Sequence, residues 1–240
     1  MNQYRTLNEW FQSPLGLSVA LEFTNALEPV TNYLKGDILL QLGHCGDNPW
    51  LNNMNFSHKW VASPVSVENS HRVESALNQL PFPRNSLDCV LAPLSLEPFG
   101  SSLTLLDEID RVLKPMGHVI ILSINPWSLW GVAAKCGLLH CYNVRKIQLR
   151  TAFNLNRTFL QRGYTQSALG HFGYFPPSNK KVWRSKFAFF DEVGKMLWPF
   201  PSGFYYYVAQ KHQYIQPTLI VHPLMRKIST DYKSPLQPAI

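Results

Sequence analysis

The chain has 240 residues, 45% of them hydrophobic, and a formal net charge of +7 at pH 7. That length and hydrophobic share suit one large folded domain, and the 18 prolines are spread too widely to mark one disordered region. No stretch approaches the roughly 18 consecutive apolar residues of a membrane-spanning helix, and no charged-then-apolar signal peptide opens the chain, so we expect a cytoplasmic protein without a transmembrane segment.

The first part of the chain shows helical spacing. Apolar side chains recur among polar neighbours over residues 6–34, and Pro14 and Pro29 interrupt any single long helix because proline clashes with the preceding turn. We therefore expect one or two helices before the first strand. The chain is predicted to divide into an N-terminal helical segment, a main domain and a C-terminal tail, at residues 1–35, 36–212 and 213–240.

Three continuous apolar runs predict central strands, at residues 38–42, 87–91 and 118–123. A central parallel strand is apolar throughout because helices cover both of its faces. Before the last run, residues 103–113 place their apolar side chains on one helical face, and Pro115 and Gly117 act as a stop. Strand, helix and strand in this order form a right-handed parallel crossover. The pattern predicts the α/β class, with these three strands adjacent and parallel.

Weaker patterns predict four further elements. Residues 59–62 and 72–74 have the composition of short strands, although polar residues interrupt both. Residues 146–162 have the spacing of a helix, and the aromatic run at residues 203–209 is typical of a late strand. We expect the end of the tail to be loosely ordered.

The four cysteines indicate neither a disulfide framework nor a metal site. Their spacing is irregular (Cys45, Cys89, Cys136 and Cys141). Cys136, His140 and Cys141 could supply soft ligands, but a structural zinc needs two ligand pairs, and the second pair is missing. We therefore expect buried or incidental thiols and no metal.

Two segments resemble the type 11 family of methyltransferases. The first, at residues 80–92, reads Leu-Pro-Phe-Pro-Arg-Asn-Ser-Leu-Asp-Cys-Val-Leu-Ala and is followed by Leu96-Glu97. The second, at residues 106–121, reads Leu-Asp-Glu-Ile-Asp-Arg-Val-Leu-Lys-Pro-Met-Gly-His-Val-Ile-Ile. Three shorter stretches further resemble a proteobacterial subgroup of uncharacterised methyltransferase-like proteins with a degenerate glycine-rich motif, at residues 10–16, 39–43 and 124–131.

This resemblance implies a class I S-adenosylmethionine-dependent methyltransferase. Its fold would be a Rossmann-like, seven-stranded, mostly parallel sheet with helices on both faces, and the cofactor S-adenosylmethionine would lie across the carboxyl ends of the first strands. The same segments also have structural interpretations. Leu80-Pro81-Phe82 can be a rigid turn packed on the sheet, and Asp88 can cap or hydrogen-bond a nearby loop.

The cofactor-binding residues that the resemblance implies depart from the family's pattern. The order acid, apolar, Gly, x, Gly, x, Gly aligns with Gln41, Leu42, Gly43, His44, Cys45, Gly46 and Asp47. Ala76 and Leu77 take the adenine position, with Ala76 where the family has Asp, and Ala92 and Pro93 would lie opposite the turn. Each charged hydrogen bond contributes about 1.5–3 kcal/mol. Their loss predicts weak or lost binding of S-adenosylmethionine, in an open cleft beside the turn.

Two functions stay open, and the first is methyl transfer to an unknown acceptor. No catalytic dyad can be assigned, so positioning would supply most of the catalysis. His44, Glu97 and Asn125 are the nearest polar candidates. Asn125-Pro126-Trp127 resembles the base-gripping motif of adenine-directed methyltransferases but follows the fifth strand instead of the fourth. We interpret it as a turn that lines the substrate entrance.

The second function is a catalytically inactive, methyltransferase-like binding module. Residues 1–140 carry a formal charge of −4, whereas residues 141–240 carry +11. Four cations surround Trp183 in the basic part: Lys180, Lys181, Arg184 and Lys186. Cations interleaved with aromatic rings can hold phosphates and stack bases, which points to nucleic acid or another polyanion as a partner. The competing interpretation is a substrate-side cap or a final hairpin with its aromatic rings in the core.

Overall fold

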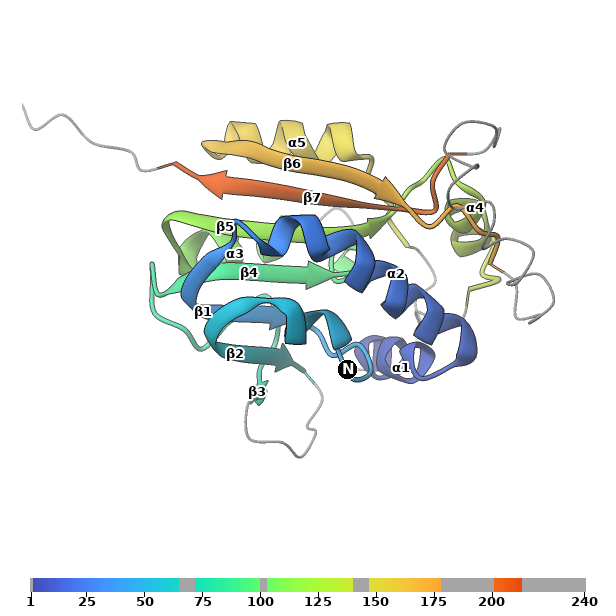
Figure 1. The fold of residues 1–240 in the computed structure, drawn as a ribbon, viewed down its shortest axis with the longest axis horizontal. Helices are drawn as coiled ribbons and strands as arrows, with labels where there is room; N and C mark the ends of the chain where they lie inside the picture. Colours follow the sequence, from blue (N-terminus) through green and yellow to red (C-terminus); the bar gives the residue numbers. More distant parts are fainter. Residues whose placement is uncertain (1, 65–71, 100–102, 140–146, 178–200, 213–240) are drawn as a thin grey trace, which may run out of the picture.

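The computed structural model describes residues 2–64, 72–99, 103–139, 147–177 and 201–212. Within these residues the strands are β1 (Lys35–Leu42), β2 (Asn55–Ser63), β3 (Arg72–Glu74), β4 (Leu87–Pro93), β5 (Leu113–Ile124), β6 (Tyr164–Phe172) and β7 (Phe204–Lys211). They form one seven-stranded sheet in the order β3-β2-β1-β4-β5-β7-β6 (Figure 1). The first five run parallel, and β7 is antiparallel to β5 and β6. The predicted α/β, mostly parallel sheet is confirmed.

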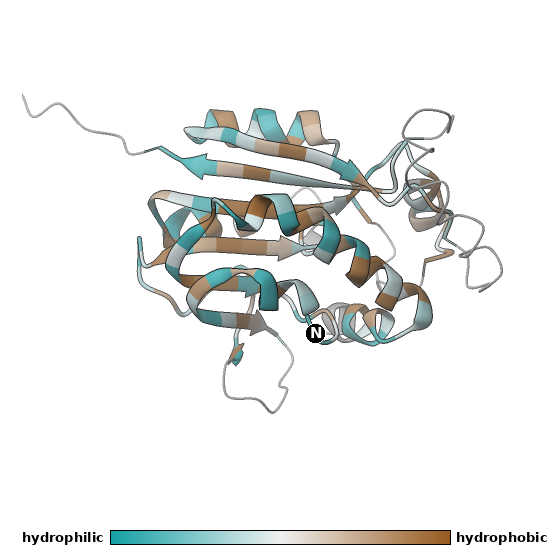
Figure 2. Ribbon diagram, viewed as in Figure 1, coloured by the Kyte–Doolittle hydropathy of each residue, from teal (hydrophilic) through white to brown (hydrophobic). Residues whose placement is uncertain are grey.

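The three central strands predicted from continuous apolar runs are adjacent and parallel, as expected. β4 lies between β1 and β5, with Val90 opposite Leu40 on one side and Val119 on the other. Figure 2 shows β4 as an apolar band in the middle of the sheet. The weaker strand predictions also fall within β2, β3 and β7, except that β7 begins at Phe204 instead of Gly203.

Helices cover both faces of the sheet. α1 (Asn2–Phe11), α2 (Pro14–Thr31), the 3-10 helix η1 (Pro49–Asn53) and α4 (Leu129–Lys135) contribute to one hydrophobic cluster. α3 (Thr104–Val112) and α5 (Ala152–Gln161) contribute to a second cluster. Alternate residues of β4 point into the two clusters, Leu91 into the first and Val90 into the second. The strand is therefore apolar on both faces, as its sequence indicates.

Three helix boundaries differ from the sequence prediction. α2 continues through Pro29 to Thr31, so only two residues of the helix follow the proline, and its clash with the preceding turn affects the helix end alone. α3 ends at Val112, before Pro115, because β5 already begins at the next residue. α5 begins at Ala152, where the Thr151 hydroxyl accepts a hydrogen bond from Asn154 N at 3.2 Å. The predicted start at residue 146 lies outside the described residues.

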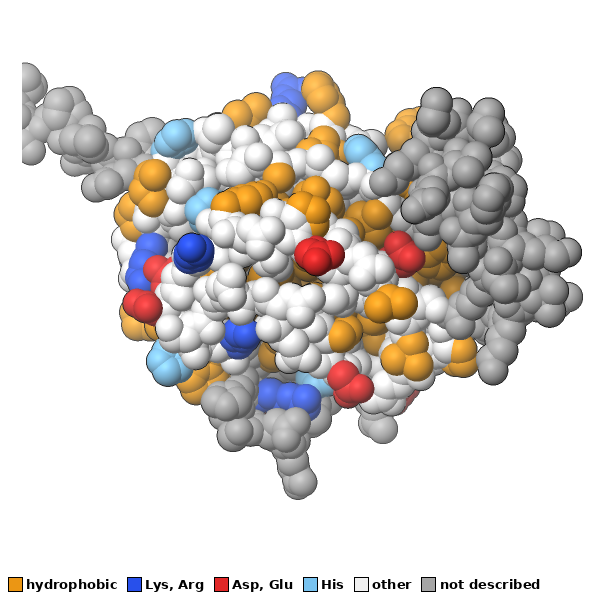
Figure 3. Space-filling view, in the orientation of Figure 1, with side chains coloured by type: hydrophobic (Ala, Val, Ile, Leu, Met, Phe, Trp, Pro, Cys, Tyr) orange, Lys and Arg blue, Asp and Glu red, His pale blue; other side chains and the backbone are white. Residues whose placement is uncertain are grey.

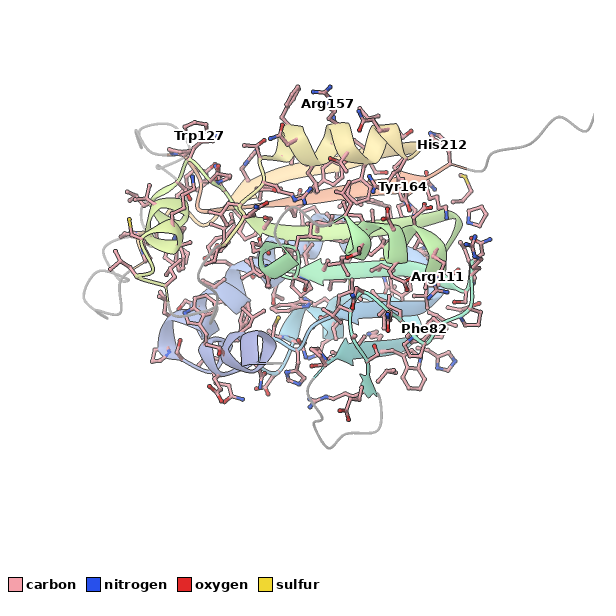
Figure 4. All side chains as sticks on the ribbon, turned by 180° about the vertical axis from the view of Figure 1, so that it is seen from behind. Phe82, Arg111, Trp127, Arg157, Tyr164 and His212 are labelled. Atoms are coloured by element: carbon pink, nitrogen blue, oxygen red, sulfur yellow. The ribbon has the colours of Figure 1, made fainter. Side chains whose placement is uncertain are left out.

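The two segments that carry the methyltransferase resemblance are joined by a side-chain clamp. The Arg111 guanidinium of α3 donates to the carbonyl oxygens of Leu80 and Phe82, each at 2.8 Å. Glu108 accepts from Leu80 N at 3.0 Å and pairs with Arg111 at 2.9 Å. Figure 4 shows Arg111 and Phe82 side by side on the far face of the sheet. This part of the motif therefore holds the Leu80-Pro-Phe-Pro turn against α3.

Asp88, at the start of β4, ties three parts of the sheet together. Its Oδ2 accepts from the backbone N–H groups of Asp37 and Ile38 at 3.0 and 2.9 Å, and its Oδ1 pairs with Lys114 Nζ at 2.7 Å. Burial alone would raise the pKa of the Asp88 carboxyl, but the hydrogen bonds from Lys114, Ile38 and Asp37 outweigh it and hold that pKa below its ordinary value. Asp88 thus has a structural role, as one interpretation of the sequence expected, but its backbone partners belong to β1 and not to a loop.

Asp88→Asn is expected to lower the free energy of unfolding by about 1–2 kcal/mol at pH 7, because the charge-assisted bonds are lost. A lowered pKa in the folded state adds stability above the ordinary Asp pKa of about 4, and this stability disappears as pH falls through the lowered value. Urea unfolding should therefore separate the two proteins at pH 7 and bring them together near pH 2. Asp37→Asn, at an exposed neighbouring side chain, is the control and should change little. An equal loss at both pH values would contradict the assignment.

The β6 end of the sheet carries a groove on the face of α2. The groove has a volume of about 410 Å³ and is lined by residues of α2, β6 and β7 that include Glu22, Pro29, His171, Phe172 and Tyr206. Figure 3 shows this face of the molecule, with hydrophobic, acidic and basic side chains interspersed. Among the described residues β6 pairs with β7 alone, and its register shifts between Gln166 and Ala168.

Candidate functional site

The candidate site lies where β1, β4 and β5 reach their carboxyl ends, on the right in Figure 1 beside α1 and α4. Ligands of open α/β sheets bind at this edge, where the strand order reverses. The chain supplies a turn after β1, a segment after β4 that leads to the 3-10 helix η2 (Glu97–Phe99), and a turn between β5 and α4. These three segments include most of the predicted site residues.

The turn after β1 has the backbone conformation that its two glycines allow. Gly43 has φ of 84° and Gly46 of 60°, in the left-handed region that side chains with a Cβ rarely adopt. Asn48 follows with φ of 48°, which asparagine tolerates better than most residues. Its Oδ1 accepts from Cys45 N at 3.1 Å, and its Nδ2 donates to Gly46 O at 3.4 Å. The loop therefore fixes itself through Asn48, which sequence reasoning did not single out.

Gln41 stands where the family's pattern has an acid, and it forms a fully buried hub beneath the turn. Its Nε2 donates to Gly43 O at 2.9 Å and to Asn48 Oδ1 at 2.5 Å, and its Oε1 accepts from Trp50 Nε1 at 2.8 Å. A carboxylate could not make the two donations. The amide at residue 41 is therefore a structural requirement of this turn.

The expectation of an open cleft beside the turn is wrong for the described residues. Gly43, His44, Cys45 and Gly46 are all buried, with His44 5% and Cys45 0% exposed. The Cys45 thiol donates to Pro93 O at 3.8 Å, so the turn does lie against Ala92 and Pro93, which are buried too. The Ser95 hydroxyl, 2.5 Å from Leu42 O, closes the same gap. The turn and the end of β4 therefore leave little of their surface exposed to a ligand.

Helix α1 covers the turn from the other side. Asn8 Oδ1 accepts from Gly46 N at 2.9 Å and lies 2.6 Å from His44 Nδ1. A Cβ added at Gly46 would lie 3.3 Å from the Cβ of Phe11, so the glycine also permits close approach of α1. No sequence signal links residue 8 to residue 46, because the contact depends on how α1 folds back over the sheet.

The His44 ring is neutral at physiological pH. Burial lowers its pKa, the Arg72 guanidinium lowers it further, and Asp47 opposes them, so that the pKa is about 4. Since Asn8 Oδ1 already accepts from Gly46 N–H, a neutral His44 would meet it with its Nδ1–H as donor. His44 Nε2 then carries a lone pair and has no hydrogen-bond partner among the described residues.

The other predicted site residues differ in exposure. Ala76 is exposed, whereas Leu77 is packed in the hydrophobic cluster of α3 and α5. Asn125 Oδ1 accepts from Trp127 N at 3.2 Å, and Trp127 itself is 78% exposed at the edge of the molecule (Figure 4). The substrate-entrance interpretation of that turn stays a prediction.

Glu97 is a buried carboxylate at the same edge. Its Oε1 accepts from the Ser123 hydroxyl at 2.7 Å and from Ile124 N at 3.4 Å, which joins the segment after β4 to the end of β5. Burial first, and then the negative charge of Glu97, raise the pKa of the Cys45 thiol far above its ordinary value. Cys45 is therefore a protonated thiol at neutral pH and not a nucleophile.

The described residues contain no cluster of three or more His, Cys, Asp or Glu side chains suited to a metal ion. His140, Cys141 and the cations around Trp183 lie outside the described residues. In the described part of the chain, no helix combines the length and apolar character needed to cross a membrane.

Comparisons with known proteins agree with this architecture. Residues 52–121, from η1 into β5, match the family model described as a methyltransferase domain. No curated protein matches the sequence of this chain. A SAM-dependent methyltransferase from Archaeoglobus fulgidus superposes with a TM-score of 0.60 at 17% identity, covering 87% of this chain and 99% of that one.

Two further solved structures share the fold. A SAM-dependent methyltransferase from Thermotoga maritima gives a TM-score of 0.60 at 16% identity, covering 87% of this chain and 97% of that one. A SAM-dependent methyltransferase from Mesorhizobium loti gives a TM-score of 0.53 at 15% identity, covering 78% of this chain and 98% of that one. These comparisons show that the chain has the fold of S-adenosylmethionine-dependent methyltransferases.

Proposed function

We propose that this chain is an S-adenosylmethionine-dependent methyltransferase of an acceptor still to be identified, with the cytoplasm as its proposed location. The observation that carries the proposal is the Gly43–Gly46 turn at the carboxyl end of β1. It is left-handed at both glycines and lies against Pro93 of β4, in the sheet order of this fold. Gly43, His44, Cys45, Gly46, Ala76, Leu77, Ala92 and Pro93 remain the proposed cofactor-binding residues.

The described arrangement does not itself fit the cofactor. The turn is buried, the N–H groups of Cys45 and Gly46 already donate to Asn48 and Asn8, and the neutral Gln41 replaces the expected acid. We therefore assign no catalytic residue and derive no step of the reaction from this arrangement. Binding requires the turn to be uncovered, and this agrees with the weak affinity that the sequence predicts.

Calorimetry with S-adenosylhomocysteine tests the proposal directly. The wild-type protein is expected to bind with a dissociation constant of about 0.1–1 mM, equivalent to roughly 4–5.5 kcal/mol. Gly43→Leu should abolish the heat, because Gly43 is buried with a positive φ and a leucine there would distort the turn. Gly137→Leu is the matched control: Gly137 also has a positive φ, of 72°, but an added Cβ there meets nothing within 4 Å. No heat from the wild-type protein at millimolar ligand would refute the proposed cofactor.

The second candidate is the noncatalytic binding module, and one observation favours it. The turn's own N–H groups are satisfied by the protein, as expected where a nucleotide site is no longer used. The +11 charge of residues 141–240 supplies the attraction for an anionic partner such as nucleic acid. In this candidate, S-adenosylhomocysteine gives no heat with any form of the protein, which is the result that distinguishes the two.

A further inference from the structure

The contact between Asn8 and the Gly43–Gly46 turn joins two distant parts of the chain. Asn8 comes from α1, whereas Asn48, which holds Cys45 N, belongs to the turn's own loop. Asn8 Oδ1 receives two donors, Gly46 N–H at 2.9 Å and the His44 ring at 2.6 Å. Removing the Asn48 side chain would break contacts inside the loop, whereas removing the Asn8 side chain would break only the polar contacts between α1 and the turn.

The Asn8 oxygen occupies two donors of a kind that can also bind a carboxylate. Backbone N–H groups of left-handed glycine turns are anion-binding donors, and a neutral imidazole N–H adds a second. A carboxamide oxygen is an acceptor of similar size to a carboxylate oxygen, without its charge. Asn8 therefore satisfies donors that would otherwise be available to the carboxylate of an amino-acid-like ligand, such as the methionyl part of the proposed cofactor.

Apolar packing holds α1 in this position. Leu7 and Phe11 are 0% and 1% exposed and belong to the cluster under α2. The Trp10 ring contacts the Trp130 ring of α4 edge-on, with centroids 6.4 Å apart. The covered turn is therefore the resting arrangement, and the two polar contacts of Asn8 are added to a helix that is already docked.

We infer that α1 is an autoinhibitory latch in which Asn8 acts as a built-in surrogate for the ligand carboxylate. The inference rests on the proposed function, because it concerns the same turn. The cofactor binds only when Asn8 has left Gly46, so the apparent dissociation constant equals the intrinsic one divided by the fraction of molecules that are open. Weakening the latch raises that fraction, whereas strengthening it lowers the fraction.

Two substitutions of one side chain should change the affinity in opposite directions. Asn8→Ala removes both contacts and is expected to lower the dissociation constant of S-adenosylhomocysteine roughly tenfold. Asn8→Asp keeps the acceptor and strengthens its bond to Gly46 N–H through the added charge. The added charge also repels the ligand carboxylate. The dissociation constant should therefore rise roughly tenfold or more. Gln12→Ala, at an exposed side chain just beyond α1, is the matched control and should leave the constant within twofold.

Amide hydrogen exchange of the ligand-free protein gives an independent readout. In Asn8→Ala, exchange of Gly46 N–H should accelerate roughly tenfold, while Cys45 N–H, held by Asn48, stays protected as an internal standard. Equal affinity of wild type and Asn8→Ala, or unchanged Gly46 exchange, would overturn the latch and leave the proposed function intact. If no form of the protein, Asn8→Ala included, binds S-adenosylhomocysteine, both the latch and the proposed function are overturned.

Discussion

Gln41→Glu is expected to lower the free energy of unfolding by about 3–5 kcal/mol at neutral pH, because it places an unpaired charge in a fully buried site. The two oxygens that Gln41 Nε2 now serves, Gly43 O and Asn48 Oδ1, would face a carboxylate oxygen. Only the bond from Trp50 Nε1 would survive. The substitution restores the acid of the family's pattern, and yet it should destabilise this chain.

The pH dependence of Gln41→Glu identifies the cause. Burial would raise the pKa of the new carboxyl, so the variant would gain stability relative to wild type as pH falls toward the ordinary Glu value of about 4.3. Guanidinium unfolding at pH 7 and pH 4.5 measures this difference. Gln166→Glu, on an exposed position of β6, is the control and should stay within about 0.5 kcal/mol. Equal stability of the two variants at pH 7 would contradict the interpretation that the three hydrogen bonds of Gln41 stabilise the turn.

Phe23→Ala should have an equally large effect, about 3–5 kcal/mol, because Phe23 is a fully buried side chain of α2. Its ring packs at centroid distances of 5.4–6.1 Å on four other rings, which come from α1, η1, β6 and β7: Phe11, Trp50, Phe172 and Phe204. The cavity would weaken the packing of α1, which covers the turn, against the sheet strands β6 and β7. Lost aromatic packing adds to the lost hydrophobic burial.

Denaturant unfolding of Phe23→Ala tests this estimate, with near-UV circular dichroism as a second signal from the aromatic cluster. Leu21→Ala is the matched control on the same helix, because Leu21 is 61% exposed and should change the stability by less than about 0.5 kcal/mol. A loss below about 1 kcal/mol for Phe23→Ala would mean that the cluster can repack around the missing ring.

The sequence predicted the centre of the sheet well because its physical requirements are local. A strand covered on both faces is mostly apolar, and residues 38–42, 87–91 and 118–123 meet that requirement apart from four polar residues: Gln41, Asp88, His118 and Ser123. Pro29 was misjudged as an interruption of the helix, because it lies in the last turn and only two helical residues follow it. The short strand β3 was predicted from the composition of residues 72–74 alone, and its bounds agree with the structure.

The candidate site was predicted only in part. Gly43 and Gly46 were identified because a left-handed backbone is a local demand that glycine meets best. The burial of the site was not predicted, because Asn8 contacts the turn only through tertiary packing. The spacing of residues along the sequence does not indicate such a contact. Gln41 was interpreted as a missing acid, since an alignment shows what a residue replaces and not the three hydrogen bonds that it makes.

The outer edge of β6 also protects the chain against self-association. A terminal strand offers unpaired N–H and C=O groups to any other strand, and long, flat, apolar edges of this kind aggregate. β6 counters this with exposed polar side chains, such as Thr165, Gln166 and Ser167, and with the register shift between Gln166 and Ala168, which twists the edge. The edge of the sheet is thereby a poor template for the sheet of a second molecule.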